Sequence, residues 1–235
     1  MEKKLDVGAV LGETFQVYAK NFPVFVGIGL LVMAPAIALQ AVLQASPAAS
    51  ALAIVGTIVT VVLGYVAQGA MTYGVFQHTR GKPVEFGNCV SVGISRFAPL
   101  FVVGLCLGIM VTLGMLACLV PGIVLVVLFF VAIPATVIEK TGLPESFQRS
   151  LKLTEGNRWQ VFAVFLVIAI TSLVVSFLPT FAAGLLGSTV LQFVAYGVGT
   201  VLTAGIQAAA PTLVYLHLRR IKETLDLEEV AGVFA

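Results

Sequence analysis

Long apolar runs dominate this chain, and they alternate with short segments that carry its charge. A helix that crosses a bilayer needs about 20 mainly apolar residues, and six runs reach or approach that length. These runs are 22–44, 51–78, 97–118, 122–138, 159–178 and 190–217. The pattern therefore predicts an all-α, polytopic membrane protein with six transmembrane helices.

The fourth run is short, and only Leu119, Val120 and Pro121 separate it from the third. Pro121 followed by Gly122 is typical of a tight turn, because proline presets φ and glycine allows positive φ. The alternative is one broken helix through 97–138. We favour two spans joined by a turn at 119–121.

The charged residues decide the orientation. All 24 of them, 13 basic and 11 acidic, fall into four clusters. The clusters are Glu2–Lys20, Arg80–Arg96, Glu139–Arg158 and Arg219–Glu229. The connections near 45–50, 119–121 and 179–189 carry no charge, so charged and uncharged connections alternate. Because Lys and Arg in short loops mark the cytoplasmic face, we predict both termini inside.

The chain also reads as three copies of one unit within a single membrane domain, 1–235. The copies are repeat 1 at 5–80, repeat 2 at 81–140 and repeat 3 at 141–220, followed by a cytoplasmic tail at 221–235. Each copy is an amphipathic cytoplasmic stretch followed by a membrane hairpin. A basic residue and an aromatic stand at each entry into lipid, as at Arg158–Trp159, which is the usual interfacial anchor. The prediction is three parallel-repeat hairpins with interfacial amphipathic helices on the cytoplasmic side.

Composition agrees with a membrane protein and narrows the function. Hydrophobic residues make up 59% of the chain and charged residues 10%, against about 25% charged in a typical soluble domain. The net charge of +2 is too small to indicate nucleic acid. The cysteines Cys89, Cys106 and Cys118 form neither a disulfide framework nor a metal pair, and we interpret them as small buried hydrophobes.

Candidate chemistry is sparse inside the predicted spans. They hold no Asp, Glu, Lys or Arg, which argues against a proton-coupled pump. Gln68 and Gln207 are the intramembrane polar candidates for a substrate path, although we favour hydrogen bonding between helices as their role. His78 and His217 stand at the cytoplasmic ends of the second and sixth runs, where an interfacial role fits them. We predict no catalytic residue, no metal site and no cofactor.

The glycines and the loop cations of the chain indicate possible binding partners. Glycine-rich helices, including the pair Gly104 and Gly108, allow close packing inside the bundle or in a homo-oligomer. Cations of the cytoplasmic loops are candidates for anionic lipid headgroups. These cations are Arg80, Lys82, Arg96, Arg149, Lys152, Arg158, Arg219 and Arg220.

Several motifs resemble those of YciC-like bacterial inner-membrane proteins, and of the membrane domain fused to some glycerophosphodiester phosphodiesterases. They are 121–123, 134–139, 144–150 and 153–159, with 12–15, 80–84 and 222–227 in addition. The chain departs from that pattern at Phe147, where alanine is more usual, and at Thr224, where glycine is. The resemblance implies a bacterial inner-membrane protein of uncharacterised function, and the family has no established active site.

Three functions stay open on the sequence. The leading hypothesis is a non-enzymatic membrane protein that organises lipid or partner proteins. The first alternative is a channel or transporter for a small neutral or lipidic substrate, which predicts a polar cavity containing Gln68 and Gln207. The second is a lipid-modifying membrane enzyme, which would need a carboxylate such as Glu139, Glu145 or Glu155 beside a histidine.

Overall fold

The computed structural model describes residues 4–44 and 50–233, and these residues are almost entirely helical, with no strand among them. The helices are α1 (Val7–Lys20), α2 (Phe22–Gln44), α3 (Ser50–Thr79), α4 (Phe86–Ser95), α5 (Phe97–Ala117), α6 (Leu119–Leu128), α7 (Ala132–Ile138), α8 (Leu143–Thr154), α9 (Arg158–Leu185) and α10 (Thr189–Val233). The all-α prediction is confirmed for this part of the chain.

Among the described residues, five stretches are long and apolar enough to cross a membrane. They are Ile54–Thr79, Phe97–Ala117, Leu119–Ile138, Arg158–Leu185 and Val190–Glu223. A sixth follows if α1 and the Phe22–Val32 part of α2 are counted as one span, although they meet at a bend of 74°. The protein is therefore a multi-pass membrane protein by length and composition, and its long helices coincide with the predicted runs.

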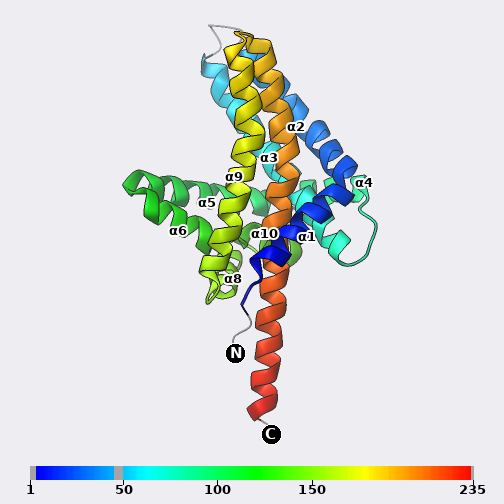
Figure 1. The fold of residues 1–235 in the computed structure, drawn as a ribbon, viewed down its shortest axis with the longest axis vertical. Coiled ribbons are helices and arrows are strands. Elements are labelled where there is room, and N and C mark those ends of the chain that lie inside the picture. Colours follow the sequence, from blue (N-terminus) through cyan, green and yellow to red (C-terminus); the bar gives the residue numbers. More distant parts are fainter. Residues whose placement is uncertain (1–3, 45–49, 234–235) are drawn as a thin grey trace.

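Two helix pairs build the long axis of the molecule. Helix α9 packs along α10 and α2 packs along α3, while α3 and α2 both contact α10. Figure 1 shows these helices running toward one end, with the C-terminal part of α10 extending toward the other. The main core lies where they meet, around fully buried Phe25, Met71 and Tyr215. Helix α1 crosses this junction obliquely and packs on α10 and α9.

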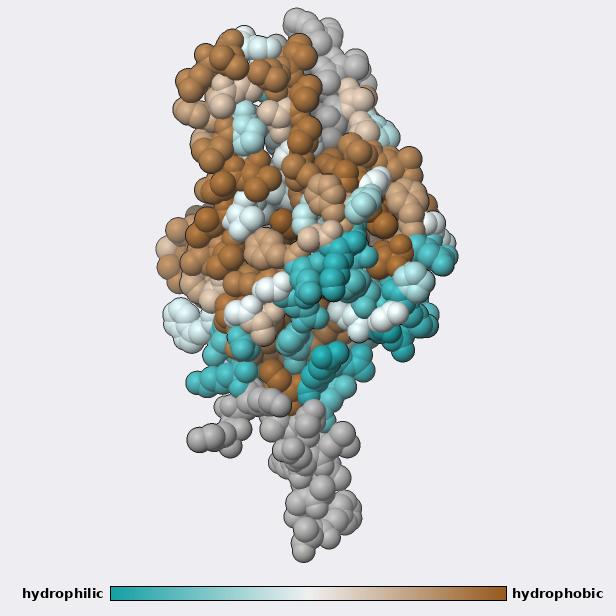
Figure 2. All heavy atoms as spheres, turned by 45° about the vertical axis from the view of Figure 1, so that its right-hand side comes forward, coloured by the Kyte–Doolittle hydropathy of each residue, from teal (hydrophilic) through white to brown (hydrophobic). Residues whose placement is uncertain are grey.

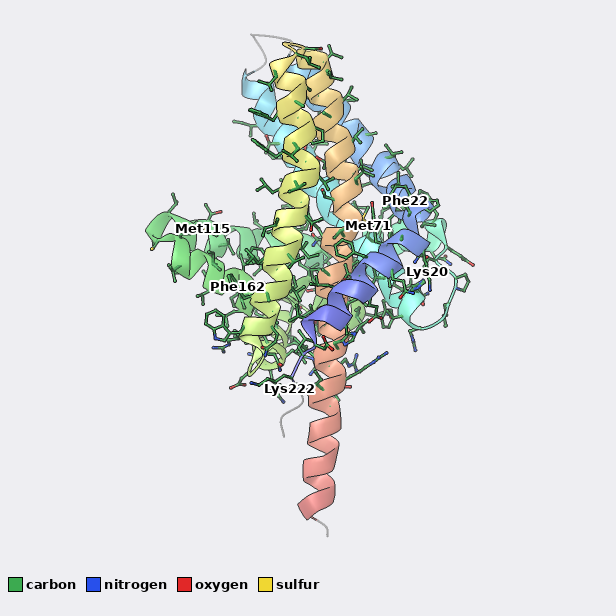
Figure 3. All side chains as sticks on the ribbon, viewed as in Figure 1. Lys20, Phe22, Met71, Met115, Phe162 and Lys222 are labelled. Carbon is green, nitrogen blue, oxygen red and sulfur yellow. The ribbon has the colours of Figure 1, made fainter. Side chains whose placement is uncertain are left out.

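The third pair takes a different direction. Helices α5 and α6 pack against each other and extend sideways, across the axis that α9 and α10 follow (Figure 1). We call residues 97–128 the α5–α6 arm. Met115 lies near its outer end (Figure 3). Apolar side chains such as Leu113, Leu116 and Leu119 are exposed there, as expected of a surface that faces lipid.

The predicted connection at 119–121 is shorter than expected. Cys118 alone is extended, with φ −172° and ψ 152°, and α6 begins at Leu119. Pro121 therefore belongs to the first turn of α6 and not to the connection. A proline is tolerated there because the first N–H groups of a helix have no partner within the helix.

A break after Leu128 divides the fourth apolar run into α6 and α7. Pro134 explains the break, since its ring nitrogen cannot donate to the carbonyl four residues earlier, at Phe130. Side chains of α8 occupy the gap: the Ser150 hydroxyl donates to the Leu128 carbonyl at 2.8 Å, and Thr154 lies 3.4 Å from the same oxygen. Hydroxyl groups can thus satisfy a carbonyl freed within an apolar span.

Helix α8 places small hydroxyl side chains against its neighbours. Helix α8 buries Ser146, Ser150 and Thr154, while Leu151 is exposed. The Ser150 and Thr154 hydroxyls face the break between α6 and α7, where a leucine could not have bonded the free carbonyl. The Ser146 hydroxyl bonds Thr136 of α7 and the Gly142 carbonyl. Burial on this helix therefore follows hydrogen bonding as well as hydropathy.

Polarity is segregated along the molecule. Figure 2 shows hydrophobic residues covering the end toward which α2, α3, α9 and α10 run, and hydrophilic residues gathered toward the opposite end. Lys222 lies toward that hydrophilic end in Figure 3. We call this region the charged end; it holds the charged residues between Arg80 and Arg96, between Glu139 and Arg158, and from Arg219 to Glu223.

Candidate functional site

Five polar side chains form a closed ring where α7, α8 and α10 meet. Arg149 of α8 donates from Nε to Oε1 of Glu139 at 2.8 Å and from Nη2 to Glu223 at 3.0 Å. Arg219 donates to Glu223 at 2.7 Å and to the Tyr215 hydroxyl at 3.3 Å. The Tyr215 hydroxyl donates to Glu139 and so closes the ring.

The local sequence explains how this polar ring assembles. Glu139 caps the C-terminal end of α7, and Lys140 follows it with φ 60°, a left-handed conformation that turns the chain sharply toward α8. Tyr215, Arg219 and Glu223 are spaced by four residues, so they share one face of α10. The ring therefore ties three helices together with two cations and two anions.

The electrostatics of the ring are balanced. Burial is the largest single effect on Arg149 and disfavours its charge, but the hydrogen bonds to Glu139 and Glu223, together with the nearby negative charge, outweigh burial and raise the pKa of Arg149. The carboxyl of Glu139 is about four-fifths covered, at 18% exposed, whereas Glu223 is 46% exposed. A charge-balanced ring of this kind can hold α7, α8 and α10 in register.

Two of the cations predicted to bind lipid headgroups belong to the polar ring. Arg149 and Arg219 are already bonded to carboxylates, and Arg80 lies over the Phe76 ring at 5.1 Å. Lys82, Lys152 and Arg158 are exposed and Arg96 is half-buried. Within the described part of the chain these last four side chains have no ion pair, whereas Arg220 does have an interaction partner.

Both predicted histidines contact the N-terminal segment. Nε2 of His217 on α10 lies 2.7 Å from Oε2 of Glu13 on α1. Nδ1 of His78 on α3 lies 2.9 Å from the side-chain nitrogen of Asn21, between α1 and α2. The histidines thus have different partners and hold the N-terminal segment against α3 and α10. The sequence did not indicate these partners, because more than 50 residues separate the members of each pair.

The two intramembrane glutamines are placed on separate helices. Gln207 of α10 is exposed and lies 3.4 Å from the Ser172 hydroxyl of α9, a contact of the kind expected between membrane helices. Gln68 of α3 is half-buried. The polar atoms that approach Gln207 belong to α9, and the hydrogen bonds of the described residues do not connect it to Gln68.

The described residues offer few side chains for metal binding or thiol chemistry. In the described residues no group of three or more His, Cys, Asp or Glu side chains could hold a metal ion. Cys89 is buried, and burial together with the nearby Glu85 raises the pKa of its thiol to about 11. Cys106 is half-buried and Cys118 is exposed at the end of the α5–α6 arm.

The predicted glycine pair has two different environments. A Cβ on Gly104 would stand 2.1 Å from the Tyr65 ring, so this glycine serves packing of α5 on α3. A Cβ on Gly108 would meet nothing within 4 Å. The two glycines therefore do not act as one contact surface within the bundle.

Comparison with known proteins places the chain in a family but assigns no activity. No curated protein and no solved structure matched it. Residues 50–218 match the family model described as Domain of unknown function (DUF7847). The matched stretch runs from the start of α3 to Leu218 of α10 and covers well over half of the chain, so this protein belongs to the DUF7847 family.

Proposed function

We propose that this protein is a non-enzymatic membrane protein that gathers anionic lipid around its charged end. The observation that carries this proposal is the contrast between two kinds of cation. Arg149 and Arg219 are neutralised within the polar ring, whereas Lys82, Arg96, Lys152 and Arg158 point to no carboxylate in the described structure. Each cation near the surface contributes about 1 kcal/mol of attraction to anionic lipid.

The proposal includes a topology. Inside the five long apolar stretches, charged residues lie only at the ends, at Arg158 and from Arg219 to Glu223. This distribution supports a bacterial inner-membrane protein with six crossings and both termini in the cytoplasm. The pairing of α2 with α3, α5 with α6 and α9 with α10 supports three hairpins at 5–80, 81–140 and 141–220. The relation to YciC-like proteins remains part of this proposal.

Lipid analysis of the purified protein tests the function. The full chain is extracted together with its surrounding lipid in polymer nanodiscs, and the lipids are identified by mass spectrometry. We expect the ratio of anionic to zwitterionic lipid to exceed that of the bulk membrane. A variant with Lys82, Arg96, Lys152 and Arg158 replaced by Gln is expected to return to the bulk ratio.

A charge-preserving variant provides the control. Exchanging Lys for Arg and Arg for Lys at the same four positions keeps each cation, so the enrichment is expected to persist. Equal lipid ratios around the wild type and in the bulk membrane would contradict lipid gathering. Lipid turnover by the reconstituted protein that a single substitution abolishes would contradict the non-enzymatic assignment.

A further inference from the structure

We propose that the angle between α6 and α9 binds one anionic phospholipid, with an acyl chain along α6 and the phosphate at Arg158. This inference rests on the proposed function and names a particular site for it. It commits to a lipid because the cavity is apolar along its length and carries a cation at one end.

A groove with a volume of about 470 Å³ lies between these two helices. Ile123, Val124 and Val127 line it from α6, and Phe162 lines it from α9. The α6 residues recur at helical spacing and so form one apolar face. The volume falls within the roughly 300–1,000 Å³ that is usual for small-molecule sites.

The direction of the α5–α6 arm explains why the groove exists. Because the arm extends across the axis of α9 (Figure 1), α6 diverges from α9 and the two helices cannot pack along their lengths. The side chains that line this open groove are apolar apart from Arg158, so they offer water few hydrogen-bond partners. In a bilayer the molecule available to fill it is a lipid chain.

The cationic end of the groove complements a phosphate. Arg158 is exposed and has no ion pair among the described residues. Asn157, the residue before α9, does not cap the helix, because its side-chain oxygen accepts from the Leu5 N–H at 2.9 Å. The first turn of α9 therefore lacks a side-chain acceptor, and the positive end of a helix favours an anion there.

Trp159 makes the site measurable. It is the only tryptophan in the chain, it lines the groove and it is 81% exposed. In phosphatidylcholine vesicles doped with brominated lipid, its fluorescence reports lipid that reaches the groove. We expect brominated phosphatidylglycerol to quench Trp159 at about fivefold lower mole fraction than brominated phosphatidylcholine, as one surface cation allows.

Three variants assign the two ends of the site. Arg158→Gln is expected to abolish the preference for phosphatidylglycerol. Val124→Phe fills the groove and is expected to reduce quenching by both lipids. Lys20→Gln is the matched control, since Lys20 and Phe162 lie on opposite sides of the molecule in Figure 3, and it should behave like the wild type. Unchanged circular dichroism shows that each variant is folded.

Three outcomes would overturn the site. Equal quenching by the two lipids in the wild type would show that the site does not select an anionic headgroup. If Val124→Phe leaves quenching unchanged but alters the oligomeric state, the groove is a contact with a second copy of the protein. If nanodiscs of Arg158→Gln still retain enriched anionic lipid while quenching is unaffected, the groove assignment fails and the proposed function stands.

Discussion

At the scale of single residues, the polar ring depends on the carboxylate of Glu139. One carboxyl oxygen of Glu139 accepts from both Arg149 and Tyr215. Removing the negative charge leaves the partly covered Arg149 guanidinium with Glu223 as its remaining anion and deprives the Tyr215 hydroxyl of a charged acceptor, and losing one partner of such a pair costs more than the pair itself contributes. The partial exposure of these side chains keeps the effect below that of a fully buried pair.

Glu139→Gln is therefore expected to lower the free energy of unfolding by about 1–3 kcal/mol. Thermal unfolding in detergent measures the change. Glu155→Gln is the matched control, because Glu155 is exposed and belongs to no ion pair of the described residues. Equal melting temperatures for both variants and the wild type would show that the ring does not stabilise the fold.

Part of this ring could have been predicted. Tyr215, Arg219 and Glu223 follow each other at intervals of four, which signals a shared helix face. The partners Glu139 and Arg149 come from other helices, and nothing in the sequence indicates that α8 folds back onto α10. A prediction from charge alone therefore counted Arg149 and Arg219 as headgroup ligands, although carboxylates already bind them.

At the scale of helices, close packing depends on glycines at particular crossings. Helix α4 packs on α3, and a Cβ on Gly93 would stand 2.5 Å from the Val66 carbonyl oxygen and 3.0 Å from the Ala70 nitrogen. These are backbone atoms, so no side-chain rotation can relieve the contact. The sequence showed two glycines in this stretch but not which of them faces a neighbour.

We expect Gly93→Ala to force α4 away from α3 and to destabilise the protein. Overpacking of this kind typically costs about 1–3 kcal/mol. Gly87→Ala in the same helix is the control, since its Cβ would meet nothing within 4 Å and alanine favours helix. The melting temperatures of both variants, measured by thermal unfolding, test this expectation. A Gly93→Ala protein as stable as Gly87→Ala would mean that the two helices do not approach so closely.

At the scale of the whole molecule, the sequence predicted the helices better than their directions. The positions of the apolar helices follow from the length that a bilayer requires. Their mutual angles do not, because lipid accepts any apolar face and the pattern carries little information about which face meets a neighbour. The α5–α6 arm is the clearest case: its residues cover the predicted span 97–118 and the first part of the span 122–138, yet it lies across the axis of α9 and α10 (Figure 1).

That direction makes the arm the critical test of six crossings. Under the proposed topology, Cys118 at the outer end of the arm lies on the non-cytoplasmic face. Cys118 is exposed, whereas Cys89 is buried and its pKa of about 11 keeps the thiol protonated near neutral pH. In a Cys106→Ala background, a membrane-impermeant maleimide should therefore label Cys118 in intact cells.

Two introduced cysteines define the faces for this measurement. Ser188→Cys, in the connection before α10, should be labelled without permeabilisation, and Lys82→Cys, between α3 and α4, only after it. Six crossings require Cys118 to follow Ser188→Cys. If Cys118 follows Lys82→Cys, or reacts only once the membrane is dissolved, the arm does not cross. The protein would then have four crossings, formed by α2, α3, α9 and α10, with the arm held against or within one leaflet.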